Sequence, residues 1–182
     1  MIRKSLFIVA WLFSIGIQAS TTSQEVINQL LRNAHGGVEI HNINGQTSYS
    51  GFVGTGYQFY FYEQKAYVRP DIQVKWGELR FQSGHHIKTT SIALPVTVGY
   101  HVFQQENVRM TLFGGGRYEQ FLRSESNSPD FAINTTQLGL TTGATIGFFN
   151  RFGISANYYH GLTSLFKDGS GKITSFSFSF NF

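Results

Sequence analysis

The chain of 182 residues contains no cysteine, which excludes a disulfide framework, a thiolate metal site and a thiol nucleophile. Proline is rare as well, with three residues, and charged side chains make up 13% of the sequence. Glycine is abundant, with 20 residues, and aromatic side chains reach 16%. This composition is unusual for a soluble globular domain and is typical of many β-strands that face an apolar solvent.

The sequence also lacks a large excess of charge of one sign. The formal net charge is +4, and it falls to +2 when Arg3 and Lys4 are removed with an N-terminal leader. A charge this small does not support a nucleic-acid partner.

The longest apolar run lies at the N-terminus, from Ser5 to Ile17, directly after Arg3 and Lys4. Ala19 follows as the small residue at the expected cleavage point. At about 13 residues the run is shorter than the roughly 20 that a membrane-spanning helix needs. Residues 1–19 are therefore predicted to be a cleaved secretory signal peptide, and any membrane-spanning structure must be built from strands.

Residues 20–35 are predicted to form a periplasmic N-terminal segment. Thr22 to Glu25 resembles a capping box, and apolar residues follow it at helical spacing, Val26, Ile27, Leu30 and Leu31. We expect a short helix of two or three turns that tethers the chain at a barrel mouth. A plug or a docking element would show the same pattern.

From Gly36 onward the hydrophobic period changes to two, which predicts β-strands over residues 36–182. The eight predicted segments are Gly36–Asn42, Gly51–Tyr62, Ala66–Trp76, Ser91–Phe103, Val108–Phe121, Gln137–Phe149, Phe152–Thr163 and Lys172–Phe182. Short turns alternate with longer polar connections along the chain. The predicted short turns are Glu63–Lys65, Gln104–Asn107 and Asn150–Arg151. The predicted longer connections are Ile43–Ser50, Gly77–Thr90, Leu122–Thr136 and Ser164–Gly171. Outer-membrane barrels alternate in this way between short periplasmic turns and longer external loops.

Alternation alone does not say which face is inside, because a soluble lipocalin-like barrel would show the same period with its apolar face turned inward. The polar face consists mostly of Gly, Ser, Thr, Asn and Gln, which suits a narrow lumen, whereas a water-facing exterior carries many Lys and Glu. We therefore predict an all-β fold, an eight-stranded antiparallel up-and-down transmembrane β-barrel in the outer membrane of a Gram-negative bacterium. The lipocalin-like barrel is the alternative.

The last segment has phenylalanine at every second position, Phe176, Phe178, Phe180 and Phe182. On a soluble protein this exposed row would be an aggregation hazard, but on a barrel it forms a lipid-facing strand. A bilayer requires every backbone polar group to be paired, so this closing strand must meet the first one.

Several short motifs resemble a known family: Gly36-Gly37-Val38, Leu94-Pro95-Val96, Phe113-Gly114-Gly115-Gly116 and Tyr159-His160-Gly161-Leu162-Thr163. With these residues the chain resembles the small outer-membrane β-barrel domain family that includes PorT-like proteins, and more distantly the eight-stranded adhesin and porin-like barrels. The resemblance implies that the terminal Phe182 is read by the barrel-assembly machinery. It also implies an accessory role in a secretion or assembly system as one alternative function.

The alternation places a set of ionisable side chains in the lumen: Glu39, His41, Arg69, Asp71, Lys75, His101, Arg109, Arg117 and Glu119. An eight-stranded barrel is just wide enough for side chains to fill, and unpaired buried charges are costly. We therefore expect a network of ion pairs that closes the lumen to solutes. A proton path or a narrow pore is the alternative.

Two motifs contain histidine, a residue type that binds metal ions and takes part in catalysis. His85 and His86 lie between Arg80 and Lys88 in a predicted external loop, and adjacent histidines are poorly placed to ligate one metal ion. The basic residues around them could instead contact lipopolysaccharide phosphates. His160 precedes Ser164 without the His-x-Ser spacing of lipid A deacylases with a barrel fold.

The sequence thus predicts no catalytic, metal or cofactor site. We expect a structural or interaction protein with a filled polar lumen, in contact with outer-membrane lipid and lipopolysaccharide, and with a protein partner bound through the loops Gly77–Thr90 and Leu122–Thr136. A lipid A-modifying enzyme is the alternative from another class.

Overall fold

The computed structural model describes residues 27–28, 30–31, 33–81, 85–126, 133–149 and 152–182. The predicted signal peptide lies outside these residues, and so does the start of the predicted N-terminal helix. Residues 27–28 and 30–31 are helical. The described part of the chain contains no candidate for a membrane-spanning helix.

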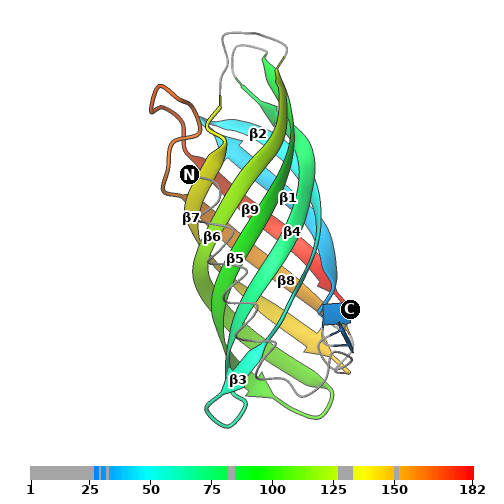
Figure 1. Cartoon of the computed structure of the whole chain (residues 1–182). Coiled ribbons are helices and arrows are strands. Elements are labelled where there is room, and N and C mark those ends of the chain that lie inside the picture. Colours follow the sequence, from blue (N-terminus) through cyan, green and yellow to red (C-terminus); the bar gives the residue numbers. More distant parts are fainter. Residues whose placement is uncertain (1–26, 29, 32, 82–84, 127–132, 150–151) are drawn as a thin grey trace.

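The described chain forms one antiparallel sheet that closes on itself (Figure 1). Its strands are β1 (His35–Ile43), β2 (Gln46–Gly56), β3 (Phe59–Phe61), β4 (Ala66–Arg80), β5 (His86–Gln104), β6 (Val108–Ser126), β7 (Thr136–Phe148), β8 (Phe152–Gly161) and β9 (Ile173–Asn181). The first strand pairs with the last, and β2 pairs with β4 to complete the circle.

Strands β2 and β3 are two parts of one interrupted strand of the barrel, because both pair with β4 in the same register. Gly56 lies opposite Asp71, and Phe59 lies opposite Val68. Between them the Tyr57 amide donates to the Pro70 carbonyl at 3.1 Å, but proline has no N–H to return the bond. The pairing with β4 is interrupted here, so β2 and β3 together occupy one strand position, which leaves eight positions and confirms the predicted eight-stranded antiparallel barrel.

The prediction of a long loop over Ile43–Ser50 is wrong. Strand β1 runs to Ile43, β2 begins at Gln46, and the two are joined by a tight turn at Asn44 and Gly45. Both turn residues have positive φ, 51° and 84°, as a two-residue turn with the twist of a hairpin requires. The Asn-Gly dipeptide is a strong hairpin signal that outweighs the polarity of the surrounding residues.

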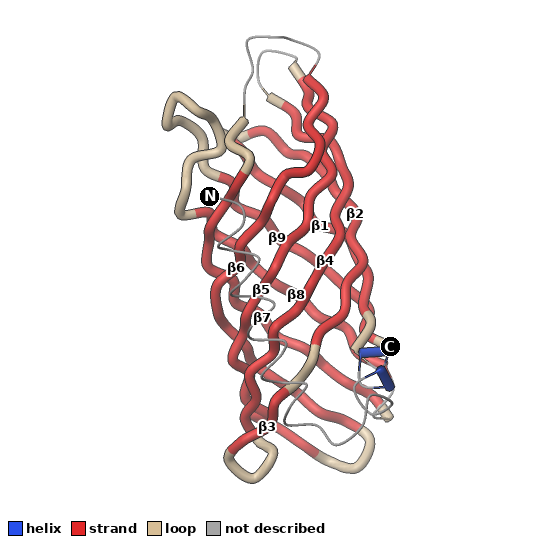
Figure 2. The backbone as a smooth tube through the Cα atoms, in the orientation of Figure 1, coloured by secondary structure: helices blue, strands red, loops and turns tan. Residues whose placement is uncertain are grey.

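The predicted loops Gly77–Thr90 and Leu122–Thr136 are also much shorter than expected, because β4, β5 and β6 continue past their neighbours (Figure 2). Residues 78–80, 86–90 and 123–126 pair into a three-stranded projection, here called the ledge. Its outward charges alternate in register, with Lys88 opposite Glu78 on one side and Glu125 on the other. Residues 82–84 and 127–132 lie outside the described part of the chain.

The outer wall is an uncharged apolar band between the ledge and the short turns. On β4, Val74 and Trp76 are exposed whereas Asp71 and Lys75 point inward and are buried. On β9 the row Phe176, Phe178 and Phe180 is exposed. The phase of the alternation is therefore as predicted, with the apolar face outside. From Val68 to Trp76 the band spans nine residues of β4, close to the length that a tilted strand needs to cross a bilayer.

The interior is layered rather than polar throughout. At the loop end, buried apolar side chains from several strands and from the loop after β8 pack together: Ile43, Leu79, Phe81, Ile87, Phe121, Ile133, Tyr159, Leu165 and Ile173. We call this group the apolar cap. Polar and charged residues occupy the lumen below it, towards the short turns.

Candidate functional site

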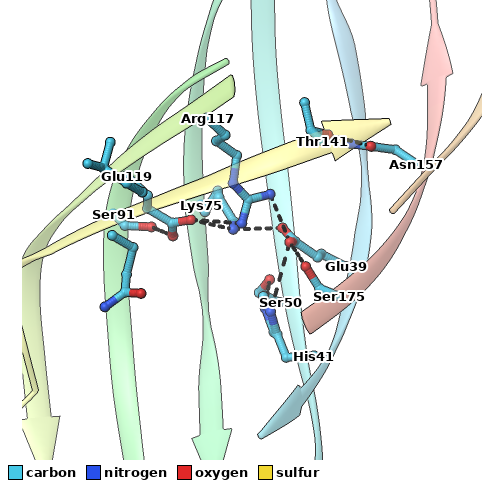
Figure 3. Close-up of polar contacts among 12 residues, drawn as sticks. Glu39, His41, Ser50, Lys75, Ser91, Arg117, Glu119, Thr141, Asn157 and Ser175 are labelled. Carbon is cyan, nitrogen blue, oxygen red and sulfur yellow. Dashed lines mark hydrogen bonds and ion pairs between the residues drawn. The ribbon is translucent and has the colours of Figure 1, made fainter. Parts of the chain in front are cut away.

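Four charged side chains meet in the middle of the lumen and form a closed ring of ion pairs (Figure 3). Lys75 Nζ lies 2.6 Å from Glu39 Oε2 and 3.0 Å from Glu119 Oε2. Arg117 bridges the same two acids, with Nη1 at 2.9 Å from Glu39 and Nη2 at 3.0 Å from Glu119. Each acid thus contacts both bases, and the ring has no net charge.

Neighbouring hydroxyl groups and a ring face complete the coordination of these charges. Ser91 donates to Glu119 Oε1 at 2.6 Å, and Ser175 donates to Glu39. The Arg117 guanidinium lies over the Tyr159 ring, 3.6 Å from its centroid. The four charged residues are 2–5% exposed, so water contributes little to their solvation, and the ring must compensate for their desolvation.

The strand pattern explains why the ring forms at one level. Arg117 and Glu119 are two residues apart on β6, so both point to the same side of the sheet. Glu39 and Lys75 arrive from β1 and β4, which flank β2 in the closed sheet. Alternation predicts the inward direction of each side chain, but only the register of the strands brings them to the same height.

Next to the ring, Glu39, His41 and Ser50 have the chemical types of a hydrolytic triad. His41 Nε2 lies 2.7 Å from Ser50 Oγ, while His41 Nδ1 lies 3.9 Å from Glu39 Oε1, beyond hydrogen-bond distance. The adjoining cavity is about 10 Å³, bounded by the ring and the apolar cap, which is room for about one water molecule.

A second polar group lies closer to the short turns. Arg69 Nη2 lies 2.9 Å from Asp71 Oδ2, and His35 Nε2 lies 3.6 Å from the same oxygen. Arg69 also donates to the Asn33 carbonyl at 3.2 Å, which ties the N-terminal segment to the lumen wall. Gln73 Nε2 completes the group at 3.2 Å from His35.

The lumen is hollow near the short turns. A cavity of about 70 Å³ extends below the ring, and a second one of about 100 Å³ follows it. Both are lined by Tyr67, Arg69, Thr145 and Asn181, so they are parts of one polar space, which we call the turn-end chamber.

All seven residues predicted to form the lumen network line the lumen, but they do not form one network. Glu39, Lys75, Arg117 and Glu119 make the ring, and Arg69 pairs with Asp71. Arg109 lines the turn-end chamber instead, and within the described residues it makes no ion pair. The expectation of complete pairing is therefore wrong for this residue, because the acids of the ring lie at a different height. A role for these residues beyond filling the lumen stays a prediction.

His35, Ser50 and Tyr159 also line the lumen, although the sequence does not predict them there. Ser50 lies in the predicted loop, His35 in the predicted N-terminal segment, and Tyr159 in a family motif. If Asn44 and Gly45 are taken as a hairpin turn, the alternation along the next strand predicts that the Ser50 side chain points inward. The alternation along β8 predicts the same for Tyr159. His35 begins β1, one residue before the predicted start.

The other candidate motifs gain no catalytic geometry. The Ser164 hydroxyl donates to the Gly169 carbonyl at 2.7 Å within its own loop, and His160 sits on the outer wall, between Leu140 and Thr174. Within the described part of the chain, no cluster of three histidine or carboxylate residues is arranged to hold a metal ion.

Comparison with known proteins supports the same architecture. A family model described as outer membrane protein beta-barrel domain matches residues 9–167. The solved structure of the outer membrane enzyme PagL is similar, with 12% identity, coverage of 80% of this chain and 97% of that one, and a TM-score of 0.56. Ail, the attachment invasion locus protein of Yersinia pestis, has 14% identity, coverage of 82% and 95%, and a TM-score of 0.46. At 12% identity the likeness to PagL is one of fold. No curated protein sequence matches the chain.

Proposed function

The chain belongs to the family of outer membrane protein beta-barrel domains, and on that premise we propose that it is a non-enzymatic barrel, closed to solutes, that acts through its loop end. As a member of this family it is an integral protein of the outer membrane, which excludes the lipocalin-like alternative. The observation that supports closure is the ion-pair ring with the apolar cap packed above it.

Closure follows from how completely the middle of the lumen is occupied. The ring spans the lumen from β1 to β6, and the space left between the ring and Phe121 of the cap is about 10 Å³. A hydrated ion is larger than this space, and entering it would mean displacing charges that are bound to each other. The turn-end chamber is therefore a blind pocket.

Single-channel recording in a planar bilayer tests closure. We expect no steady conductance from the purified barrel, because a solute has no path past the ring. The double variant Arg117→Ser/Glu119→Ser removes two bulky side chains of opposite charge, and it should conduct while keeping the heat-modifiable gel mobility of a folded barrel. A large steady conductance from the wild-type protein would refute the proposal.

The ledge is the surface through which the barrel would contact a partner or the lipopolysaccharide layer. It presents exposed basic residues, Arg80, Lys88 and Arg123, just beyond the uncharged band, at the height where lipid phosphates lie. Exchanging Arg80, Lys88 and Arg123 for glutamine should weaken co-purification of lipopolysaccharide several-fold and leave gel mobility unchanged. Equal lipopolysaccharide content in both proteins would contradict this assignment.

A protein partner remains part of the proposal, either at the ledge or, for an accessory component of a secretion or assembly system, at the short turns. Photocrosslinkers placed at Arg123 on the ledge and at Glu63 in a turn distinguish the two sites in intact cells. Capture of one defined protein from the turn alone would favour the accessory role. We also propose that the terminal Phe182 serves as the signal for the barrel-assembly machinery.

Enzyme activity is the rival function, favoured by the contact between Ser50 and His41. Three features oppose it. Glu39 is already bound by Lys75 and Arg117, and its 3.9 Å separation from His41 is too long to orient the imidazole. The cavity of about 10 Å³ has no room for an acyl chain. Mass spectrometry of lipid A from cells with the wild-type protein and with Ser50→Ala decides the matter. Loss of acyl chains that depends on Ser50 would establish an enzyme.

A further inference from the structure

The larger part of the turn-end chamber has an unbalanced set of charges. Its lining includes two arginines, Arg69 and Arg109, together with His101, and no aspartate or glutamate. Arg69 is neutralised by Asp71, which lines the adjoining part of the chamber deeper in the lumen. Arg109 has no such partner among the described residues, so the side chains that line this part of the chamber carry an excess of positive charge.

His101 adds a buried hydrogen-bonding group that the protein leaves unsatisfied. The residue is 7% exposed, and its Nδ1 lies 2.8 Å from Thr111 Oγ1. Its Nε2 has no hydrogen-bond partner among the described residues, and neither has Arg69 Nε. When the Thr111 hydroxyl donates to Nδ1, the neutral imidazole carries its proton on Nε2 and is a donor there. Buried donors without partners are uncommon in native proteins and call for an explanation.

The position of these donors follows from the strand register. Arg109 and Thr111 are two residues apart on β6 and point into the lumen together, and His101 is the cross-strand partner of Thr111 on β5. A register shift between His101 and Phe103 turns both Val102 and Phe103 to the outer wall, where they are exposed. The polar wall formed by His101, Arg109 and Thr111 is thus part of the rigid barrel rather than of a loop.

We propose that the turn-end chamber binds a small molecule through an oxyanion group, a carboxylate or a phosphate. Arg109 would neutralise the anion, because a guanidinium can donate two parallel hydrogen bonds to such a group. His101 would donate from Nε2. The space of about 100 Å³ holds several water molecules, enough for a group of this size. The ligand enters through the mouth at the short turns, which the topology of outer-membrane barrels places in the periplasm.

Binding is tested on the purified full-length mature barrel in detergent micelles, with sodium acetate and sodium phosphate as separate probes at constant ionic strength. The readout is the NMR signal of His101 in protein labelled at histidine, assigned by its loss in His101→Gln. We expect a saturable shift with at least one probe. In Arg109→Gln binding should weaken by about tenfold or more.

Lys167→Gln is the control, because it removes an exposed basic residue of the loop between β8 and β9, outside both the chamber lining and the ledge. It should bind the probes like the wild type. A shift with acetate alone assigns a carboxylate ligand, and a shift with phosphate alone assigns a phosphate. The absence of a saturable shift with both probes overturns the proposal, and so does equal affinity in the wild type and in Arg109→Gln when both show the gel mobility of a folded barrel.

Discussion

Replacing Lys75 with methionine measures how much the ion-pair ring contributes to stability. The change removes one of two bases and leaves Glu39 and Glu119 to share Arg117, so the buried ring acquires a net negative charge. Lys75 Nζ lies 2.6 and 3.0 Å from the two acids, and at an effective dielectric constant of about 20 each contact corresponds to about 6 kcal/mol of attraction. Much of this attraction is offset by desolvation, and breaking a buried pair costs about 3–5 kcal/mol overall.

The free energy of unfolding is measured by urea titration of the barrel in lipid vesicles, with the folded fraction read from heat-modifiable gel mobility. Lys65→Met is the matched control, since Lys65 is half exposed in a short turn and lies 3.6 Å from the exposed Glu63. Exposed pairs of this kind contribute up to about 1 kcal/mol. We expect Lys75→Met to lose about 3–5 kcal/mol and Lys65→Met to lose less than about 1 kcal/mol.

The double variant Lys75→Met/Glu119→Gln separates charge imbalance from simple loss of packing. It removes one base and one acid, restores neutrality and keeps the Arg117 contact with Glu39 at 2.9 Å. We expect it to be more stable than Lys75→Met alone. The role assigned to the ring would be refuted if Lys75→Met lowered the free energy of unfolding by less than about 1 kcal/mol. It would also be refuted if the loss in the double variant equalled the sum of the losses in Lys75→Met and Glu119→Gln.

Three further predictions concern single positions. Gly139→Ala places a Cβ 2.3 Å from a tyrosine ring in the lumen and should lower the free energy of unfolding by about 1–3 kcal/mol in the same urea titration. Gly116→Ala is the control and should have little effect, because its Cβ would lie 4.0 Å from the nearest atom. Gly45→Ala introduces a Cβ at a φ of 84° in the tight turn and should cost about 1–2 kcal/mol in that titration, while an unchanged midpoint would contradict the turn geometry. In the exposed loop before β9, two hydrogen bonds from Ser170 lower the pKa of Asp168. The bond from the Ser170 side chain has the larger effect, and the bond from its backbone N–H has the smaller one. The contacts therefore stabilise the loop above the ordinary carboxyl pKa and lose their effect as the pH falls through the lowered value, and Ser170→Ala should raise the Asp168 midpoint in an NMR titration.

The strands and their outward phase were predictable from sequence because side chains alternate with a fixed period of two along a strand. The exposed row Phe176, Phe178 and Phe180 on β9 shows how directly the pattern transfers to the structure. The connections were less predictable, because polar residues can form a loop or extend a strand into water. The ledge has a polar sequence because it stands beyond the apolar band, and only the pairing of β4, β5 and β6 made it a sheet.

For the lumen, the sequence by itself determined which ionisable residues point inward, since each lies on the opposite phase to the apolar face. Only the tertiary structure decided which of them meet. Arg117 and Arg109 have the same inward phase on β6, yet the first is held by two acids and the second lines a hollow chamber without an acid. The difference comes from the stagger of the strands around the barrel, which sets the height of each side chain and depends on the closure of β1 against β9 and of β2 against β4.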